Sequence, residues 1–244
     1  MSTVQNTIAV VVPTRGDRPQ FIANCWRLID SQTMQPVVKH IVDFPPVSDS
    51  VDITQRYRIG YNYISQNFDV DLIAFMEDDD WYSHDYLSIL YQQWQLSGQT
   101  DLFGMNKTLY YNLAINKYFY FNHENRASMM NTFIKPGLQI DWCNDSEPYT
   151  DMHLWSTKNN LSKKVIPYIP GLCIGIKHGI GLVGGEFHRS RLFRYDTEDN
   201  GEFQATVDSI SYDFYKSIAS KLPSVSPELL TYEGDRAATL TNKI

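Results

Sequence analysis

The chain has 244 residues, of which 43% are hydrophobic and 14% aromatic. This is enough apolar material for one large α/β domain or two small ones. The composition excludes a disordered chain. The formal net charge of -7 disfavours a protein that coats nucleic acid through phosphate contacts. The three cysteines are widely spaced and form no C-x-x-C pair, so we expect free thiols.

The N-terminal residues lack the basic stretch and long apolar run of a signal peptide. No segment approaches the roughly 18 consecutive apolar residues that a membrane helix needs. We therefore expect a cytoplasmic protein that does not associate with membranes.

The first hundred residues alternate between strand-like and helix-like segments. Residues 8–12 are a continuous apolar run, mostly β-branched, which is typical of a strand buried on both faces. The apolar spacing then predicts, in order, a helix at 21–32, a strand at 37–42, a helix at 53–68, a strand at 72–76 and a helix at 84–96. This alternation predicts a Rossmann-like, mostly parallel sheet with flanking helices.

Polar segments follow all three predicted strands, at residues 13–18, at Asp43 and at residues 77–80. Ligands of such sheets bind beyond the carboxyl ends of the strands. We therefore expect these three segments to form one binding site.

The second half of the chain has a weaker pattern. The predicted elements are antiparallel strands at 108–121, a helix that begins near 149–155, strands at 165–177 around Pro170 and Gly171, a glycine-rich loop at 179–185, a helix at 208–222 and a loosely packed tail at 223–244.

Residues 77–80 are four consecutive acids that directly follow the predicted strand at 72–76. Adjacent carboxylates repel one another unless a cation offsets their charge, and Mg²⁺ or Mn²⁺ prefers oxygen ligands. A solvated acidic turn is the alternative interpretation. The position at the end of a buried strand favours a metal site.

Residues 74–87, AFMEDDDWYSHDYL, resemble the acidic DXD motif of family-2-like inverting glycosyltransferases. Residues 11–19, VVPTRGDRP, are similar to the opening segment of that family, and residues 31–33 are similar to the end of its first helix. The resemblance covers roughly the first 100 residues. It implies a GT-A fold with a smaller antiparallel acceptor-side region.

The resemblance implies a single domain over residues 1–244. Its nucleotide-sugar-binding half would span 1–105, its acceptor and catalytic half 106–200, and a C-terminal helix and tail 201–244. It also implies a UDP-sugar donor and a Mn²⁺ or Mg²⁺ cofactor.

Carried over by position, the resemblance implies the following roles: Pro13, Thr14 and Arg15 line the nucleotide pocket, Asp43 hydrogen-bonds the base, Glu77 and Asp78 lie near the ribose and the metal, and Asp79 is the main metal ligand with Asp80 beside it. The family usually has aspartate where this chain has Glu77. A register of Asp78-x-Asp80 therefore remains open.

Inverting sugar transfer needs a general base that takes the proton of the acceptor hydroxyl. Residues 150–155, TDMHLW, look like the family's motif for this base, which makes Asp151 the candidate. Thr150 replaces the usual glutamate. Asp141 and Asp145 are competing candidates, and Asp151 could instead be a helix N-cap.

A late histidine often completes the metal site of GT-A enzymes, with a basic residue nearby for the diphosphate. His178 and Lys177 fit these two roles by resemblance, and His188 and Arg189 are the alternatives. The glycines that follow could let the loop fold over the donor phosphates.

The sequence thus predicts a metal-dependent glycosyltransferase that moves a hexosyl or pentosyl group to an acceptor hydroxyl with inversion. The acceptor remains open among a glycan, a protein, a small molecule and, as a minority hypothesis, a hydroxylated base in phage DNA. The alternatives are a nucleotidyltransferase or metal-dependent phosphohydrolase, and a non-catalytic module that binds nucleotide sugars. Residues 13–18 are not the glycine-rich phosphate loop that would favour the first alternative.

Overall fold

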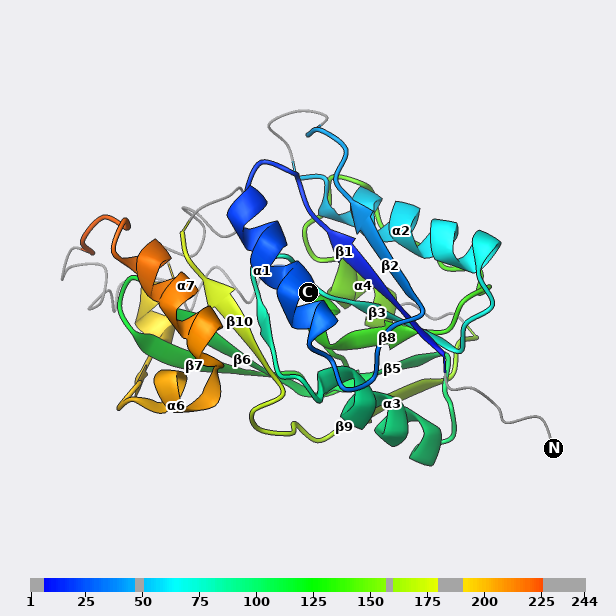
Figure 1. Ribbon diagram of the computed structural model, residues 1–244. Helices are drawn as coiled ribbons and strands as arrows, with labels where there is room; N and C mark the ends of the chain where they lie inside the picture. Colours follow the sequence, from blue (N-terminus) through cyan, green and yellow to red (C-terminus); the bar gives the residue numbers. More distant parts are fainter. Residues whose placement is uncertain (1–6, 47–50, 157–159, 180–190, 226–244) are drawn as a thin grey trace, which may run out of the picture.

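The computed structural model describes residues 7–46, 51–156, 160–179 and 191–225 (Figure 1). In chain order its elements are β1 (Ile8–Pro13), α1 (Pro19–Asp30), β2 (Val38–Val42), α2 (Ile53–Asn67), β3 (Leu72–Phe75), β4 (Trp81–Tyr82), α3 (Tyr86–Leu96), β5 (Leu102–Met105), β6 (Lys107–Asn112), β7 (Lys117–Asn122), η1 (Met129–Asn131), β8 (Thr132–Ile134), α4 (Thr150–Ser156), β9 (Lys163–Ile166), β10 (Cys173–Lys177), η2 (Leu192–Arg194), β11 (Thr197–Glu198), α6 (Glu202–Thr206) and α7 (Ser209–Ala219).

A six-stranded sheet with the order β2-β1-β3-β8-β5-β9 forms the centre of the fold. Strand β1 pairs in parallel with β2 and β3, and β5 pairs in parallel with β9. Strand β8 lies antiparallel to both of its neighbours, β3 and β5. The mostly parallel sheet that the alternating pattern predicted is therefore confirmed.

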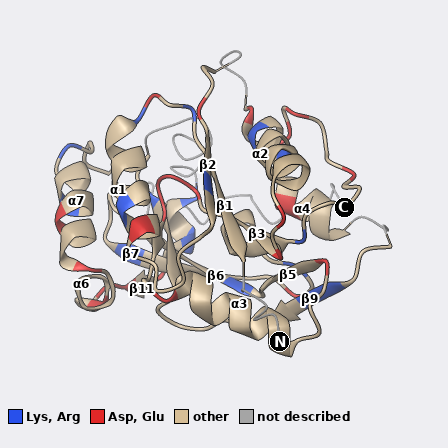
Figure 2. Cartoon of the chain, turned by 45° about the vertical axis from the view of Figure 1, so that its right-hand side comes forward, with Lys and Arg blue, Asp and Glu red and all other residues tan. Residues whose placement is uncertain are grey.

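Helices cover both faces of this sheet, because the strands are apolar on both sides (Figures 1 and 2). Alternate residues of β1 belong to different cores. Ile8, Val10 and Val12 share a cluster with side chains of α1 and α3. Ala9 and Val11 share another cluster with side chains of α2 and α4. The predicted helices at 21–32, 53–68 and 84–96 correspond to α1, α2 and α3.

Helix α2 packs very closely on β1 at Gly60. A Cβ atom added to Gly60 would lie 2.3 Å from a side-chain methyl of Val11 and 3.1 Å from one of Val42. Only a residue without a side chain fits there, which fixes the distance between α2 and the strands that end at the site.

A second, five-stranded sheet has the order β11-β7-β6-β10-β4. Three of its four pairings are antiparallel, including the β6–β7 hairpin predicted at 108–121, and β6 pairs with β10 in parallel. Its buried side chains form a third core with Phe21 and Leu28 of α1 and with α6 and α7. The expected arrangement of a mostly parallel sheet with flanking helices and a smaller second sheet is confirmed.

The strands predicted at 165–177 around Pro170 and Gly171 are present as β9 and β10, and they belong to different sheets. Strand β9 extends the central sheet, whereas β10 lies in the second sheet. Gly171, with a φ of +77°, lets the chain turn between them. The predicted loop at 179–185 lies outside the described residues except for Gly179, as do His188, Arg189 and residues 226–244.

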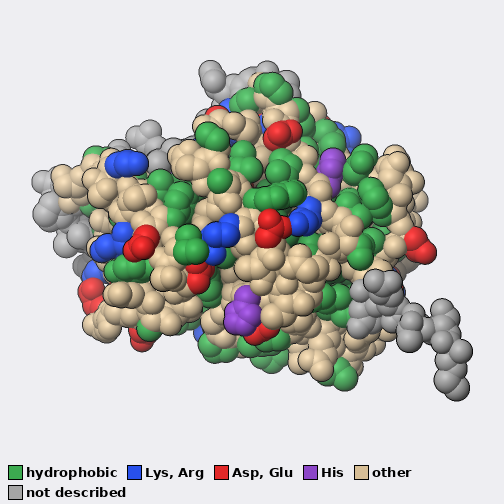
Figure 3. Space-filling view, viewed as in Figure 1, with side chains coloured by type: hydrophobic (Ala, Val, Ile, Leu, Met, Phe, Trp, Pro, Cys, Tyr) green, Lys and Arg blue, Asp and Glu red, His purple; other side chains and the backbone are tan. Residues whose placement is uncertain are grey.

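Within the described ranges, no helix is long and apolar enough to cross a membrane. On the face that carries α1, basic and acidic side chains are interspersed over the part of the surface that the structure describes (Figure 3). That surface lacks the continuous basic stripe that a nucleic-acid coat protein would use.

Candidate active site

The loops that follow β1, β2 and β3 lie against one another, as the sequence predicted. The Thr14 hydroxyl donates to Asp78 at 2.7 Å, which joins the first loop to the acidic loop of residues 77–80. Gly16, with a φ of +75°, approaches the backbone oxygen of Asp43 so closely that an added Cβ would lie 3.1 Å from it. The carboxyl end of the parallel sheet therefore carries one continuous polar surface.

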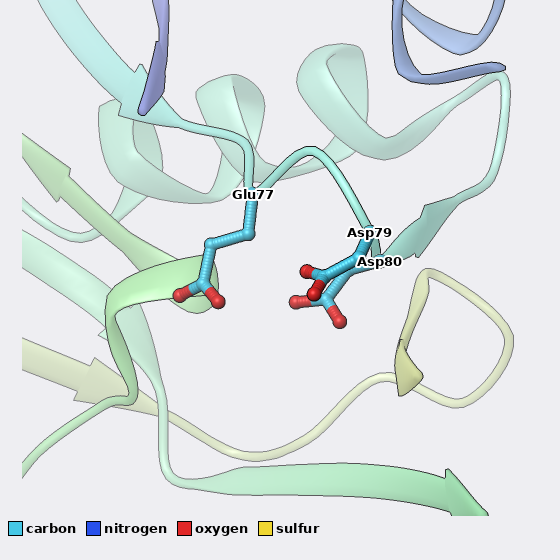
Figure 4. Close-up of side chains that lie close together, drawn as sticks. All are labelled: Glu77, Asp79 and Asp80. Atoms are coloured by element: carbon cyan, nitrogen blue, oxygen red, sulfur yellow. The ribbon is translucent and has the colours of Figure 1, made fainter. Parts of the chain in front are cut away.

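Three carboxylates of the acidic loop point into one space (Figure 4). Glu77, Asp79 and Asp80 each offer an oxygen, and these atoms all lie within 4.8 Å of one another. Asp80 is buried, and its Oδ1 accepts a hydrogen bond of 2.8 Å from the backbone N–H of Ile176. Its Oδ2 is buried with no hydrogen-bond partner among the described residues. An orphaned carboxylate oxygen among three hard donors fits Mg²⁺ or Mn²⁺.

Asp78 does not belong to this group of three. Its carboxylate accepts hydrogen bonds from the Thr14 hydroxyl at 2.7 Å and from Arg18 at 2.8 Å, and the residue is buried. Burial and the neighbouring charge of Asp79 raise its pKa to about 7, against the opposing effect of Arg18. The structure thus separates Asp78 from the three carboxylates that converge.

His178 lies at the end of β10, where it contacts Asp79. Its Nε2 is 2.9 Å from Asp79 Oδ2 and 3.1 Å from an Arg18 nitrogen. The imidazole is buried and packs against the ring of Phe21 at 4.6 Å between centroids. His178 thus contacts the acidic loop through Asp79, and the role of metal ligand implied for it stays a prediction.

The ionisation of the acidic loop is set by burial and by nearby cations. Burial raises the pKa of Glu77 and raises that of Asp80 well above its usual range, although Lys177 opposes both shifts. For Asp79, burial is outweighed by Arg18 and by the hydrogen bond with His178, so its pKa is lowered. Of the three carboxylates that converge, Asp79 is therefore firmly ionised, and Glu77 and Asp80 gain from an added cation.

Lys177 supplies positive charge beside this group. Burial alone would lower its pKa, but the nearby carboxylates, Asp80 foremost, raise it, so the ammonium stays charged. Its Nζ lies 4.8 Å from the centroid of the Tyr110 ring. A fixed cation facing the acidic loop is suited to a diphosphate.

Arg56 was not predicted, and it joins the ends of β1 and β2. Its fully buried guanidinium donates to the backbone oxygen of Thr14 and, at 3.2 Å, to that of Val42. Asp52 accepts two further hydrogen bonds from it, at 3.1 and 2.7 Å. The i,i+4 spacing of Asp52 and Arg56 was visible in the sequence, but this spacing is more typical of an exposed helix pair.

The predicted nucleotide-binding residues lie along the edge formed by these strand ends. Pro13 is the last residue of β1 and pairs with Val42 of β2. Arg15 lies in the loop beyond it, with its Nε 3.7 Å from an Asp17 carboxylate oxygen. Asp43 directly follows β2 and is exposed. Of the predicted nucleotide-binding residues outside the acidic loop, Thr14 contacts that loop directly, through Asp78.

Asp151 lies in the first turn of α4, so it follows the start of the helix instead of preceding it as an N-cap would. It forms an ion pair with Arg126, and its side chain is 16% exposed. Burial raises its pKa, with Arg126 opposing the shift. Its charge is among the causes that raise the pKa of Glu77, after burial.

The two competing aspartates have more exposed surroundings. The side chain of Asp141 is 75% exposed, and that of Asp145 is 45% exposed and held by Arg58 at 2.8 and 2.7 Å. Both are more exposed than Asp151, whose side chain is 16% exposed. Asp151 is therefore the best-placed candidate base of the three.

Aromatic side chains line one face of the β6–β7 hairpin next to these groups. Tyr110 and Phe119 are directly paired across the hairpin, and their rings are nearly parallel at an angle of 14°. Phe121 lies on the same face of β7, and the Arg126 guanidinium lies 5.7 Å from its ring centroid. This aromatic face therefore lies between two cations. One is Arg126, which pairs with Asp151, and the other is Lys177, which contacts Tyr110.

No protein-family model matches the chain, and a comparison with curated proteins finds no match. Solved structures that are similar include S. aureus TarS 1-349 in complex with UDP, at 12% identity, 85% coverage of this chain, 72% coverage of that chain and a TM-score of 0.47. The same protein in complex with UDP-GlcNAc matches at 11% identity, 87% and 79% coverage and a TM-score of 0.45. A197 from STIV matches at 14% identity, 66% and 82% coverage and a TM-score of 0.44.

Proposed function

We propose that this chain is a metal-dependent glycosyltransferase that transfers a sugar from a UDP-sugar to an acceptor hydroxyl with inversion. The observation that carries the proposal is the group of Glu77, Asp79 and Asp80, whose oxygens lie within 4.8 Å of one another at the carboxyl end of a parallel sheet. The orphaned Oδ2 of Asp80 indicates that this group is incomplete without a cation.

These three carboxylates are the residues that would hold Mn²⁺ or Mg²⁺. The hydrogen bond between His178 Nε2 and Asp79 Oδ2 would help to orient Asp79. When bound, the ion would supply positive charge for the donor's diphosphate as the bond to the sugar breaks. A register of Glu77-x-Asp79 is favoured over Asp78-x-Asp80, because Asp78 is already bound to Thr14 and Arg18.

The nucleotide would lie along the ends of β1 and β2, where Pro13, Thr14 and Arg15 border the pocket and the exposed Asp43 is available to the base. Arg56 holds this edge in place through the Thr14 and Val42 carbonyl groups. Lys177, fixed beside Asp80, would bind the diphosphate and stabilise the leaving UDP.

Asp151 would take the proton of the acceptor hydroxyl as its oxygen attacks the anomeric carbon. Burial gives this carboxylate a raised proton affinity, while the ion pair with Arg126 keeps it ionised and fixes its direction. The aromatic face of Tyr110, Phe119 and Phe121 lies beside Arg126 and Lys177 and would offer the acceptor rings against which to pack.

The alternative of a phosphohydrolase or nucleotidyltransferase has less support. Those enzymes commonly cradle phosphates with a glycine-rich loop after the first strand. Here Gly16 is the loop's one glycine, and its close approach to the Asp43 backbone shows that it serves the packing of two loops.

Asp151→Asn tests the assigned base. The amide keeps the size of the side chain but cannot accept the proton, so sugar transfer should fall by roughly 10²–10⁴-fold while UDP affinity stays the same. Transfer is measured as UDP release with an acceptor, and donor binding by calorimetry. Asp145→Asn, a matched change at an exposed carboxylate, should retain full activity. Full activity in the Asp151 variant would remove Asp151 from the mechanism.

A further inference from the structure

Arg18 is held directly over the acidic loop. It directly precedes α1, and its guanidinium lies 3.0 Å from Asp79 Oδ2 and 2.8 Å from Asp78 Oδ1. The side chain is 16% exposed and packs 5.2 Å from the centroid of the Phe21 ring. One cation thus bridges two neighbouring carboxylates in a mostly buried position.

Asp79 belongs both to this bridge and to the group of three carboxylates that converge. The oxygen that Arg18 contacts, Oδ2, is also 2.9 Å from His178. A divalent ion held by Asp79 would therefore lie close to the guanidinium, and two cations at such a distance repel each other. The ion pair of Arg18 with Asp79 and the binding of a divalent ion by Asp79 therefore weaken each other.

A displaced Arg18 would have a second partner within reach. Its loop follows β1 at the carboxyl end of the sheet, where the phosphates of a bound nucleotide lie in α/β folds. A guanidinium forms paired hydrogen bonds with phosphate oxygens as readily as with carboxylates. The donor brings a diphosphate to the same place as the ion.

We propose that Arg18 is the counter-cation of the metal-free site and a binding residue for the donor's diphosphate, which it contacts once a divalent ion has taken Asp79. This inference rests on the proposed function. It assigns Arg18 a role at each stage: it stabilises the empty acidic loop, competes with the ion when no nucleotide is present, and favours the complex that contains both.

A purely structural role would have a different signature. If Arg18 only held the loop in shape, its removal would weaken the binding of ion and nucleotide together. Competition followed by phosphate binding instead makes the two affinities change in opposite directions.

The test compares Arg18→Gln with wild-type protein in two titrations. The affinity for Mn²⁺ alone, followed through the electron paramagnetic resonance signal of the free ion, should rise roughly tenfold, since one charge-assisted contact competes with the ion. The affinity for UDP at saturating Mn²⁺, measured by calorimetry, should fall roughly tenfold, since one charge-assisted contact is lost. Arg27→Gln, a change on the same helix at an arginine paired with Asp208, should alter neither affinity.

Arg18→Lys provides a second variant if the glutamine variant does not fold. The ammonium keeps the charge but cannot bridge two carboxylates, so both affinities should shift in the same directions by smaller factors. Weaker Mn²⁺ binding, or UDP binding that does not fall, overturns the role of Arg18 while leaving the proposed function in place. Wild-type protein that binds neither Mn²⁺ nor UDP overturns both.

Discussion

Asp80 has two carboxylate oxygens in different surroundings. One accepts a backbone hydrogen bond from Ile176, and the other is buried without a partner among the described residues. Burial raises the pKa of this group well above its usual range, so an ionised Asp80 is costly in the metal-free protein. Asp80 therefore favours ion binding but lowers the stability of the metal-free protein.

Asp80→Asn should separate these two effects. The amide keeps the acceptor for Ile176 and can donate to the neighbouring carboxylates, so the melting temperature in chelator should be equal to or above that of wild type. Affinity for Mn²⁺ should fall by a factor on the order of ten or more, because a charged ligand is lost. Calorimetric titration and thermal melts measure both. Unchanged Mn²⁺ affinity would show that Asp80 is not a ligand.

At the residue scale, the sequence was informative where the relevant groups are adjacent in the chain. Four consecutive acids after an apolar run predicted the acidic loop, and the structure places three of them together. Arg18 was predicted only as part of the segment 13–18, without a role of its own, and Arg56 was not predicted. Arg18 contacts carboxylates 60 and 61 positions away, and Arg56 donates to a carbonyl 42 positions away, and such pairings depend on the fold rather than on local spacing.

At the element scale, segments with a clear local pattern were predictable, and two short strands of the central sheet were not. Strands β1 and β3 are continuous apolar runs, and α1 to α3 have helical spacing, so local pattern determines them. Strands β5 and β8 were not predicted; they have four and three residues and take their partners from across the sheet. Runs of this length fit a helix segment or a loop equally well, and tertiary pairing decides between them.

The N-terminus of α7 gives a prediction at this scale. Asp208 caps the helix by accepting from Ser211 N–H at 3.0 Å, and it also accepts from Trp81 at 3.1 Å and pairs with Arg27. Burial would raise its pKa, but these hydrogen bonds outweigh burial and lower it to about 2. The stabilisation is therefore present above the unfolded-state pKa of about 3.9 and is lost as pH falls towards 2.

Asp208→Ala should lower the free energy of unfolding by about 1 kcal/mol at pH 6, and the difference from wild type should shrink at pH 3. Urea unfolding at the two pH values measures it. Asp213→Ala, a change within the same helix, serves as the control. A difference that is the same at both pH values would contradict the assigned capping role.

At the scale of the whole molecule, the account depends on three loops from one sheet edge and on a second sheet that faces them. The first sheet supplies the acidic loop and the strand ends for the nucleotide, and β10 of the second sheet supplies Lys177 and ends next to His178. The ion, the nucleotide and the protein should therefore form one coupled complex.

The most direct test is a calorimetric titration of UDP into the wild-type protein, once with saturating Mn²⁺ and once with excess chelator. The account predicts binding with Mn²⁺ and a loss of at least about tenfold in affinity with chelator, because the acidic loop then repels the diphosphate. Equal affinity under both conditions, or no binding under either, would contradict a metal-dependent nucleotide-sugar site.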